Sequence, residues 1–252
     1  MYLLAISPRG QVFSMPQNRQ IKSKQRVADH GEVFTNEREV KAMCNLVKSE
    51  TERIDSRFLE PACGTGNFLA EILTRKLEVV KAKYRRSPLD YEKNAILALS
   101  SLYGVDILQD NAIACRERLF ALWDKHYTAV CKSEANQQTR DAARCLLRRN
   151  IICGNALSMM CVDENGQDTP EPIVFSEWSF VSGSMVKRRD FRLDVLLKEN
   201  DDPTLYDTQV SLFEETADSV DNWMIDPVTG EAVPKPIREY PPIHYRRLSE
   251  HG

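Results

Sequence analysis

Two glycines and three polar residues stand where α/β proteins bind their ligands. Gly64 and Gly66 lie in a turn between a strand-like and a helix-like segment, while Glu60, Asp106 and Asn155 occur at the ends of three strand-like segments. A glycine turn lets a ligand approach the backbone, and the free N–H groups of the following helix bind polar groups. A carboxylate after the second strand accepts hydrogen bonds from ribose hydroxyls. A simple tight turn would also fit the glycines, but Glu60 and Asp106 favour a nucleoside-containing cofactor.

Other kinds of chemistry have less support in the sequence. The chain has no GxxxxGK[ST] loop, and Leu69 replaces the third glycine of GxGxxG, so neither an NTPase nor a pyrophosphate-binding turn is indicated. The seven cysteines include no CxxC pair and no Cys/His cluster at zinc-ligand spacing, so we expect reduced core thiols and no metal site. Cys63 lies in the glycine turn, where we expect a small packing residue rather than a nucleophile.

Strand-like and helix-like segments alternate along the chain, which predicts an α/β fold with a doubly wound parallel sheet. Asn36 is expected to cap a first helix. The strands are expected at residues 57–62, 102–107 and 150–157, and the further helices at 68–80, 91–101, 110–127 and 137–149. Beyond Cys161 the pattern weakens, and residues 172–175 and 193–197 are candidate strands.

The glycine turn and its flanks resemble a known family. The string FLEPACGTGNFL (Phe58–Leu69) closely resembles motif I of the N6-adenine DNA methyltransferases of restriction–modification type, the loop that holds S-adenosylmethionine. His30–Thr35 looks like motif X, which contacts the methionine end of the cofactor. Gly104–Ile107 is similar to motif II, and Gly154–Leu157 is similar to motif III. The four motifs occur in the order of the family, over roughly residues 29–160.

This resemblance implies a Rossmann-like fold of the class I methyltransferase type with S-adenosylmethionine as its cofactor. Asp106 would bind the ribose, and Asn155 would bind the adenine amino group. In motif X, Asn36 replaces the proline that is usual in the family. The residues that the resemblance assigns to the cofactor are Phe34, Thr35, Glu60, Pro61, Ala62, Cys63, Gly64, Thr65, Gly66, Asn67, Phe68, Asp106, Ile107, Asn155 and Ala156.

One motif of the family is missing. Motif IV, Asn/Asp-Pro-Pro-Tyr/Phe, accepts hydrogen bonds from the adenine amine and stacks on the flipped base. The Pro241–Pro242 pair follows Tyr240 and precedes Ile243, so it does not match this motif. Trp178 is expected to be a core residue rather than a base-stacking platform. We therefore expect no catalytic residue here and no methylation by the chain alone.

Three functions remain open. The favoured one is the cofactor-binding subunit of a split, site-specific adenine-N6 DNA methyltransferase of restriction–modification or phage-defence type. A partner subunit would then supply the catalytic loop and target recognition, and the sheet would be incomplete, because the chain ends where the catalytic strand of the family is due. The alternative is a catalytically inactive cofactor-binding protein with a regulatory or structural role. The third is an unrelated Rossmann enzyme, such as a methyltransferase acting on RNA or on a small molecule.

Composition and charge divide the chain into three parts. Its 252 residues, 42% of them apolar, suffice for one domain with an appendage. Residues 1–28 form a basic arm with five basic and no acidic side chains, and 29–198 form the cofactor-binding domain. Residues 199–252 form an irregular tail, acidic over 199–231 and then rich in proline.

The charged segments suggest partners. The basic arm and the cluster Lys187–Arg192 are candidates for contact with DNA phosphate, with a solvated surface as the alternative. The acidic and proline-rich tail, with Tyr240 and Tyr245, is a candidate to dock on the partner subunit. No segment approaches about 18 uncharged apolar residues, and the N-terminus lacks the basic region of a signal peptide, so we expect a cytoplasmic protein with no membrane partner.

Overall fold

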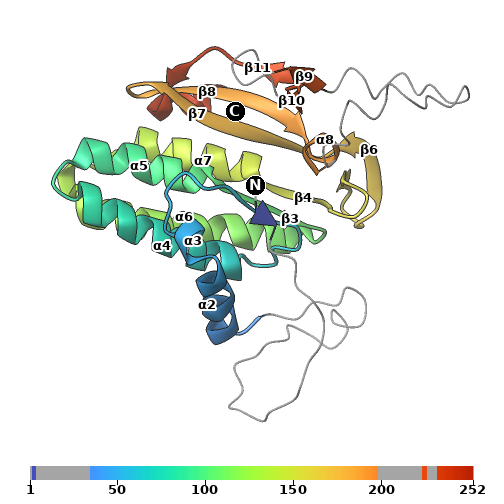
Figure 1. Cartoon of the computed structure of the whole chain (residues 1–252), viewed down its shortest axis with the longest axis horizontal. Helices are drawn as coiled ribbons and strands as arrows, with labels where there is room; N and C mark the ends of the chain where they lie inside the picture. The colour runs from blue at the N-terminus through green and yellow to red at the C-terminus, as the bar shows by residue number, and fades with distance from the viewer. Residues whose placement is uncertain (1, 4–34, 198–222, 226–231, 252) are drawn as a thin grey trace, which may run out of the picture.

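The computed structural model describes residues 2–3, 35–197, 223–225 and 232–251, which form a mixed α/β protein around a mostly parallel sheet (Figure 1). Four strands of this sheet are parallel, and two form an antiparallel hairpin at one edge. In spatial order they are β1 (Tyr2–Leu3), β2 (Phe58–Glu60), β3 (Leu102–Asp106), β4 (Ile151–Asn155), β5 (Met160–Val162) and β6 (Asp168–Pro172). The order of the strands in space is therefore their order in the sequence.

Each helix expected from the sequence is present, with its ends shifted by a few residues. The helices among the first four strands are α2 (Glu37–Leu46), α3 (Lys48–Thr51), α4 (Asn67–Tyr84), α5 (Pro88–Ser100), α6 (Gln109–Cys131) and α7 (Gln137–Asn150), with the 3-10 turn η1 (Lys132–Glu134). Asn36 caps α2 as predicted, because its side chain accepts a hydrogen bond from the Arg38 N–H (2.9 Å).

The helices pack on one face of the parallel strands. Phe58, Leu102 and Ile151 point into the same apolar cluster as helices α2 and α4–α7, whereas Leu59 and Tyr103 point to the opposite face. Connections between parallel strands are right-handed in nearly all proteins, so a chain that always steps in one direction places its helices on one face. A doubly wound sheet needs a reversal of that direction. The described strands show none, so that part of the fold prediction is wrong for the described residues.

A second sheet covers the opposite face. Its two long strands, β7 (Val174–Ser182) and β8 (Met185–Arg192), form an antiparallel hairpin that extends over α5 and α7 (Figure 1). Ile173 and Phe175 pack on Leu59 and Tyr103, and the Tyr103 and Phe175 rings lie edge to face with centroids 5.2 Å apart. The far end of β7 packs on the helices. Trp178 is buried there and donates to the Asn150 side chain (3.0 Å), so it is a core residue as predicted.

One expectation for this region is wrong and another is confirmed in part. Residues 193–197 form a short helix, α8 (Leu193–Leu197), rather than a strand, because an apolar run of five residues carries no usable period. The candidate strand at 172–175 is extended as predicted, but it is divided between the end of β6 and the start of β7, with Ile173 between them. The sequence did not predict β8 or its pairing with β7.

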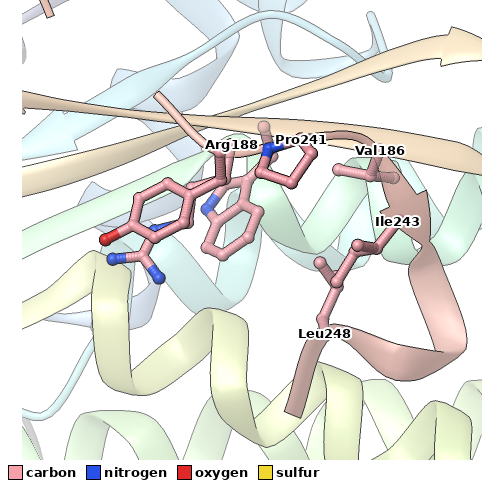
Figure 2. A pocket seen from close by; sticks show the side chains of 7 residues that line it. Val186, Arg188, Pro241, Ile243 and Leu248 are labelled. Atoms are coloured by element: carbon pink, nitrogen blue, oxygen red, sulfur yellow. The ribbon is translucent and has the colours of Figure 1, made fainter. Parts of the chain in front are cut away.

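Much of the expected irregular tail is ordered against the rest of the chain. Strands β11 (Arg238–Glu239) and β12 (Ile243–His244) pair with β8, and the 3-10 helix η4 (Tyr245–His251) packs on α7. Pro241 lies beside Arg188 of β8 in a small pocket (Figure 2). Strands β9 (Trp223–Ile225) and β10 (Ala232–Pro234) form a separate hairpin. Most of the acidic segment 199–231 lies outside the described residues.

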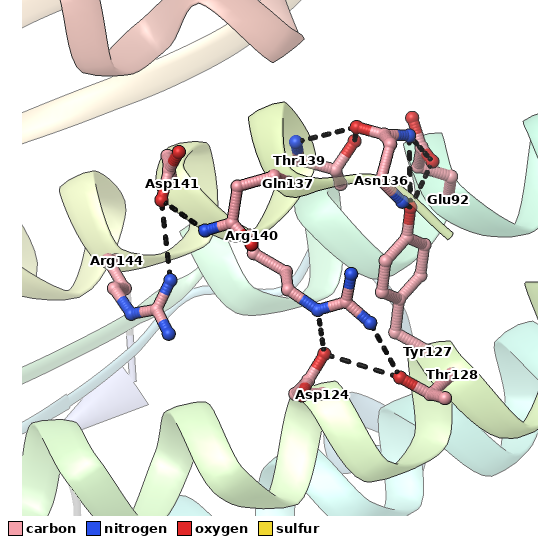
Figure 3. A network of polar contacts seen from close by, with 10 residues as sticks. All are labelled: Glu92, Asp124, Tyr127, Thr128, Asn136, Gln137, Thr139, Arg140, Asp141 and Arg144. Carbon is pink, nitrogen blue, oxygen red and sulfur yellow. Dashed lines mark hydrogen bonds and ion pairs between the residues drawn. The ribbon is translucent and has the colours of Figure 1, made fainter. Parts of the chain in front are cut away.

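A buried carboxylate ties the end of the chain to the helices. Glu92 of α5 is 2% exposed and accepts hydrogen bonds from the hydroxyls of Tyr127 (2.5 Å) and Tyr245 (2.6 Å) and from the Arg246 guanidinium (2.5 Å). Figure 3 shows Glu92 beside Tyr127 and Asn136, next to the Arg140–Asp124 ion pair. Burial raises the pKa of Glu92, but these donors outweigh it, so the pKa lies below its ordinary value.

A buried lysine joins α4 to the amino-terminal ends of two strands. Lys76 is fully buried, and its ammonium group donates to Ser101 Oγ (2.7 Å) and to the carbonyls of Ile54 (3.1 Å) and Ser56. These acceptors are uncharged, and burial lowers the pKa of Lys76 to about 7.

We expect the lowered pKa of Lys76 to make the free energy of unfolding depend on pH. Between pH 7 and 10.5 the unfolded chain holds a proton on Lys76 that the folded protein releases, so this lysine makes stability rise with pH across that window. Buried thiols with raised pKa values act in the opposite sense and are common to every variant. The free energy of unfolding of wild type minus that of Lys76→Met, measured in urea at several pH values, should therefore increase from pH 7 upward. A Lys83→Met variant, on the exposed side of the same helix, is the control, and equal pH profiles for the two variants would contradict this role.

Candidate functional site

The glycine turn lies where β2 ends and α4 begins, at the carboxyl edge of the parallel strands. The Cys63 N–H donates to the Val105 carbonyl (2.9 Å), which holds the turn against β3, and the Gly66 N–H donates to the Cys63 carbonyl (2.8 Å). Gly64 and Gly66 have φ angles of 52° and 81°, a left-handed conformation that glycine adopts without strain. The N-cap residue of α4 is Gly66, which has no side chain to cap the helix, and the Leu69 N–H donates to the Glu60 carboxyl. Among the described residues, the N–H groups of Asn67 and Phe68 therefore remain available to a ligand.

Asp106 connects the glycine turn to the next helix. Its Oδ2 accepts a hydrogen bond from the Gly64 N–H (2.8 Å), and its Oδ1 accepts from the Leu108 N–H (2.9 Å) and from the Asn111 side chain (3.2 Å). The carboxylate of β3 and the turn after β2 therefore lie in contact, as expected for two neighbouring strand ends. Asn111, which completes this arrangement, was not singled out from the sequence.

One carboxyl oxygen of Glu60, the last residue of β2, lacks a hydrogen-bond partner among the described residues. The residue is 6% exposed, and the oxygen without a partner is the buried Oε2 atom. Burial raises the pKa of Glu60 well above the ordinary value, and the neighbouring Cys115 and Asp106 raise it further. A hydrogen bond from the Leu69 backbone acts in the opposite direction but does not outweigh them. A buried carboxyl oxygen without a partner costs free energy. Glu60 would be stabilised as a carboxylate by a cationic group bound at the carboxyl edge.

Two cysteines pack beneath the turn. A Cβ atom at Gly66 would lie 2.7 Å from Cys115 Sγ, and one at Gly104 would lie 3.0 Å from Cys63 Sγ. The pKa of Cys63 lies well above the ordinary value, because of its contact with Cys115 and its burial. A protonated, buried thiol is a poor nucleophile. Cys63 is thus a packing residue, as predicted, and all seven cysteines are free thiols, five of them buried.

The third strand end contributes less than expected. The Asn155 side chain closes the turn after β4, since its Oδ1 accepts from the N–H groups of Leu157 (3.0 Å) and Ser158 (3.5 Å) and its Nδ2 donates to Asp168 (3.1 Å). Ala156 packs on the apolar cluster of the second face. Ile107, after Asp106, is 36% exposed at the carboxyl edge. The side-chain amide of Asn155 therefore already makes hydrogen bonds within the protein. A ligand would have to compete with these partners for it.

The expected motif X residues are described in part. Phe34 lies outside the described residues, whereas the Thr35 carbonyl accepts a hydrogen bond from the Asn67 side chain (3.3 Å) at the start of α4. Asn67 Oδ1 in turn accepts from Arg118 of α6, a contact that sequence reasoning missed. Thr35, Asn67 and Arg118 line a groove of about 420 Å³ between α2, α4 and α6. The residue before the cap of α2 thus lies beside the start of α4.

The remaining expected site residues belong to the turn itself and to the core. Phe68 is buried in the cluster beneath the helices, so it supports the turn rather than lining a ligand site. Pro61 and Thr65 are half-buried and Ala62 is exposed.

The basic cluster expected to face DNA is largely paired within the protein. Lys187 pairs with Glu239, Arg189 with Glu177, and Arg192 with Asp194. Arg188 is buried, pairs with Asp190, and lies over the Tyr240 ring (4.2 Å). Arg188 therefore cannot reach phosphate, and the solvated-surface alternative describes the other three better.

Comparisons of the chain with family models, with curated proteins and with solved structures found no match. Among the described helices, none is both long and apolar enough to cross a bilayer. The described residues also contain no group of three or more histidine, cysteine or acidic side chains arranged to hold a metal ion. The geometry of the carboxyl edge is therefore the basis of any functional proposal.

The contact between Gly66 and Cys115 can be tested with a matched glycine. Ala at Gly66 or at Gly166 carries the cost of a left-handed residue, about 1–2 kcal/mol, but nothing lies within 4 Å of a Cβ at Gly166. Gly66→Ala should cost about 1–3 kcal/mol more than Gly166→Ala, because its Cβ meets Cys115 Sγ. In a Cys115→Ala background this excess should largely disappear. Equal losses of unfolding free energy for the two alanine variants in the wild-type background would show that the thiol does not constrain the turn.

Proposed function

We propose that the chain is the S-adenosylmethionine-binding subunit of a split adenine-N6 DNA methyltransferase. The observation that carries the proposal is the buried Oε2 atom of Glu60, which has no hydrogen-bond partner among the described residues and lies beside a glycine turn and Asp106. S-adenosylmethionine is a nucleoside with a sulfonium and an ammonium group. Its ribose hydroxyls could donate hydrogen bonds to Asp106, and its cationic groups could pair with the Glu60 carboxylate. The resemblance of Phe58–Leu69 to motif I supports the same cofactor.

Each part of the site would then have a role in holding the cofactor. Glu60 would face its cationic end, Asp106 would accept from the ribose, and the N–H groups at the start of α4 would lie beside the turn. The bound cofactor supplies an electrophilic methyl group, so no metal ion is required from the protein. The residues of this chain bind and orient it, whereas the acceptor for the adenine amine would come from a partner subunit.

The shape of the sheet supports a partner. Strand β1 covers only two residues of β2, and among the described strands nothing lies beyond β1. Open edges of sheets are normally paired or covered. A partner subunit carrying motif IV could add its strand beyond β1, one strand removed from β2 and its glycine turn, and bring target recognition with it. The proposed DNA contact of the basic arm concerns residues 1–28, most of which lie outside the described residues.

The cofactor can be tested by exchanging Glu60 for glutamine. Because the raised pKa makes the folded protein retain a proton that the unfolded chain releases above pH 4.5, wild-type stability falls as the pH rises, and Glu60→Gln should be more stable at neutral pH. The same variant should bind S-adenosylmethionine more weakly, at least about tenfold, because it lacks the carboxylate. Calorimetry and urea unfolding measure the two effects.

A second buried glutamate is the control. Glu92→Gln should lower stability, because Glu92 is well partnered, and should leave cofactor affinity unchanged. Absence of S-adenosylmethionine binding by the wild-type chain would refute the proposed cofactor.

The split enzyme predicts where activity appears. The purified chain should transfer no methyl group from labelled S-adenosylmethionine to plasmid DNA, because it has no amine acceptor loop. Together with the product of a neighbouring gene that carries Asn/Asp-Pro-Pro-Tyr/Phe, it should methylate adenine, and Asp106→Ala in this complex should reduce the rate at limiting cofactor. Methylation by the chain alone would disprove the split, and a stable but inactive complex would favour the inactive cofactor-binding protein.

A further inference from the structure

Asn111 is the side chain that fixes the orientation of Asp106. It lies in the first turn of α6, is 1% exposed, and donates from Nδ2 to Asp106 Oδ1 (3.2 Å). Among the described residues, the other two donors to this carboxylate are the backbone N–H groups of Gly64 and Leu108. Among the three, Asn111 alone can be removed without changing the course of the backbone.

The three donors occupy the two carboxylate oxygens unequally. Oδ1 accepts from both Leu108 and Asn111, whereas Oδ2 accepts only from Gly64. An ionised carboxylate offers about two acceptor positions on each oxygen. Oδ1 is therefore filled from the start of α6, and the capacity that remains lies on Oδ2, the oxygen beside the glycine turn.

We propose that Asn111 is a positioning residue, which holds Asp106 so that Oδ2 faces the ribose of the cofactor. This proposal rests on the proposed function of the site. Without the Asn111 amide, the carboxylate is held on its Oδ1 side by a single backbone N–H and can rotate about its Cβ–Cγ bond. Its hydrogen bond to a ribose hydroxyl then loses its fixed geometry, while the rest of the cofactor site is unchanged.

A buried asparagine can also serve the fold alone, and the chain offers a matched example. Asn150 is likewise 1% exposed, donates to the carbonyls of Ser100 (3.0 Å) and Leu102 (3.1 Å), and accepts from Trp178. It is the last residue of α7, directly before β4, at the opposite edge of the sheet from Asp106. Asn150→Leu should therefore lower stability without touching ribose recognition.

The experiment compares S-adenosylhomocysteine with its 2′,3′-dideoxy analogue by calorimetry on the full chain. The wild type should prefer S-adenosylhomocysteine at least about tenfold, because the analogue leaves the Asp106 carboxylate unpaired. In Asn111→Leu this ratio should fall toward one through weaker binding of S-adenosylhomocysteine, with similar binding of the analogue. Asn150→Leu should keep the wild-type ratio. Asn111→Ser, whose hydroxyl is too short to reach Asp106, is the second variant in case the leucine variant does not fold.

The outcomes separate the two proposals. A wild-type ratio in the folded Asn111 variants would overturn the positioning role and leave the cofactor site intact. A wild type that binds S-adenosylhomocysteine but does not distinguish the dideoxy analogue would overturn ribose recognition by Asp106, and the role of Asn111 with it. A wild type that binds neither ligand would refute the proposed function itself. Loss of the ratio in Asn150→Leu as well would assign the effect to general destabilisation.

Discussion

The carboxylate of Asp106 is the point at which the carboxyl edge of the sheet is held together. It accepts from the turn after β2, from the backbone after β3 and from the first turn of α6, so three segments distant in sequence share one acceptor. Those contacts are possible only because the turn can come close. Gly66 and Gly104 leave room for the thiols of Cys115 and Cys63, and any larger residue would push the turn away from β3. The geometry of the edge therefore depends on a charged acceptor and on two missing side chains.

Three buried ionisable groups differ in how fully the described residues satisfy their hydrogen bonds and charge. Glu92 has donors from two tyrosines and an arginine, and they outweigh its burial. The Lys76 ammonium group donates to uncharged acceptors, so its hydrogen bonds are made but no acceptor neutralises its charge. Burial therefore lowers its pKa. Glu60 has an oxygen with no partner among the described residues, and its pKa is raised. Proteins tolerate such groups mainly at functional sites. Of the three, Glu60 alone leaves a buried oxygen without a partner among the described residues, and it lies at the carboxyl edge.

The sequence predicted the alternating part of the fold because each helix there buries one apolar stripe and each strand follows a turn signal. The helix cap at Asn36 and the glycine turn were visible for the same local reason. The hairpin of β7 and β8 was missed because its exposed face is charged and Arg188 of its buried face pairs with Asp190, so Lys187–Arg192 reads as a basic cluster. Asn111, Cys115 and Arg118 were missed because they act on residues 5 to 51 positions away. The spacing of Asn111 on α6, directly after the strand that ends in Asp106, was the one local signal that could have found it.

The way in which the two faces of the sheet are covered limits how a partner could approach. Helices cover one face, and Ile173, Phe175 and Leu193 cover the other, so neither face needs a second subunit to bury it. Tyr245, a candidate for docking on a partner from sequence, is buried against Glu92 in its own chain, and Tyr240 lies against Arg188. Among the described elements the sheet is open at two edges, β1 and β6, and the β1 edge is the one nearer the turns at the carboxyl ends of β2 and β3. In the proposed complex the partner would therefore meet this chain at the β1 edge, through added backbone hydrogen bonds one strand away from the cofactor site, rather than across a broad apolar surface.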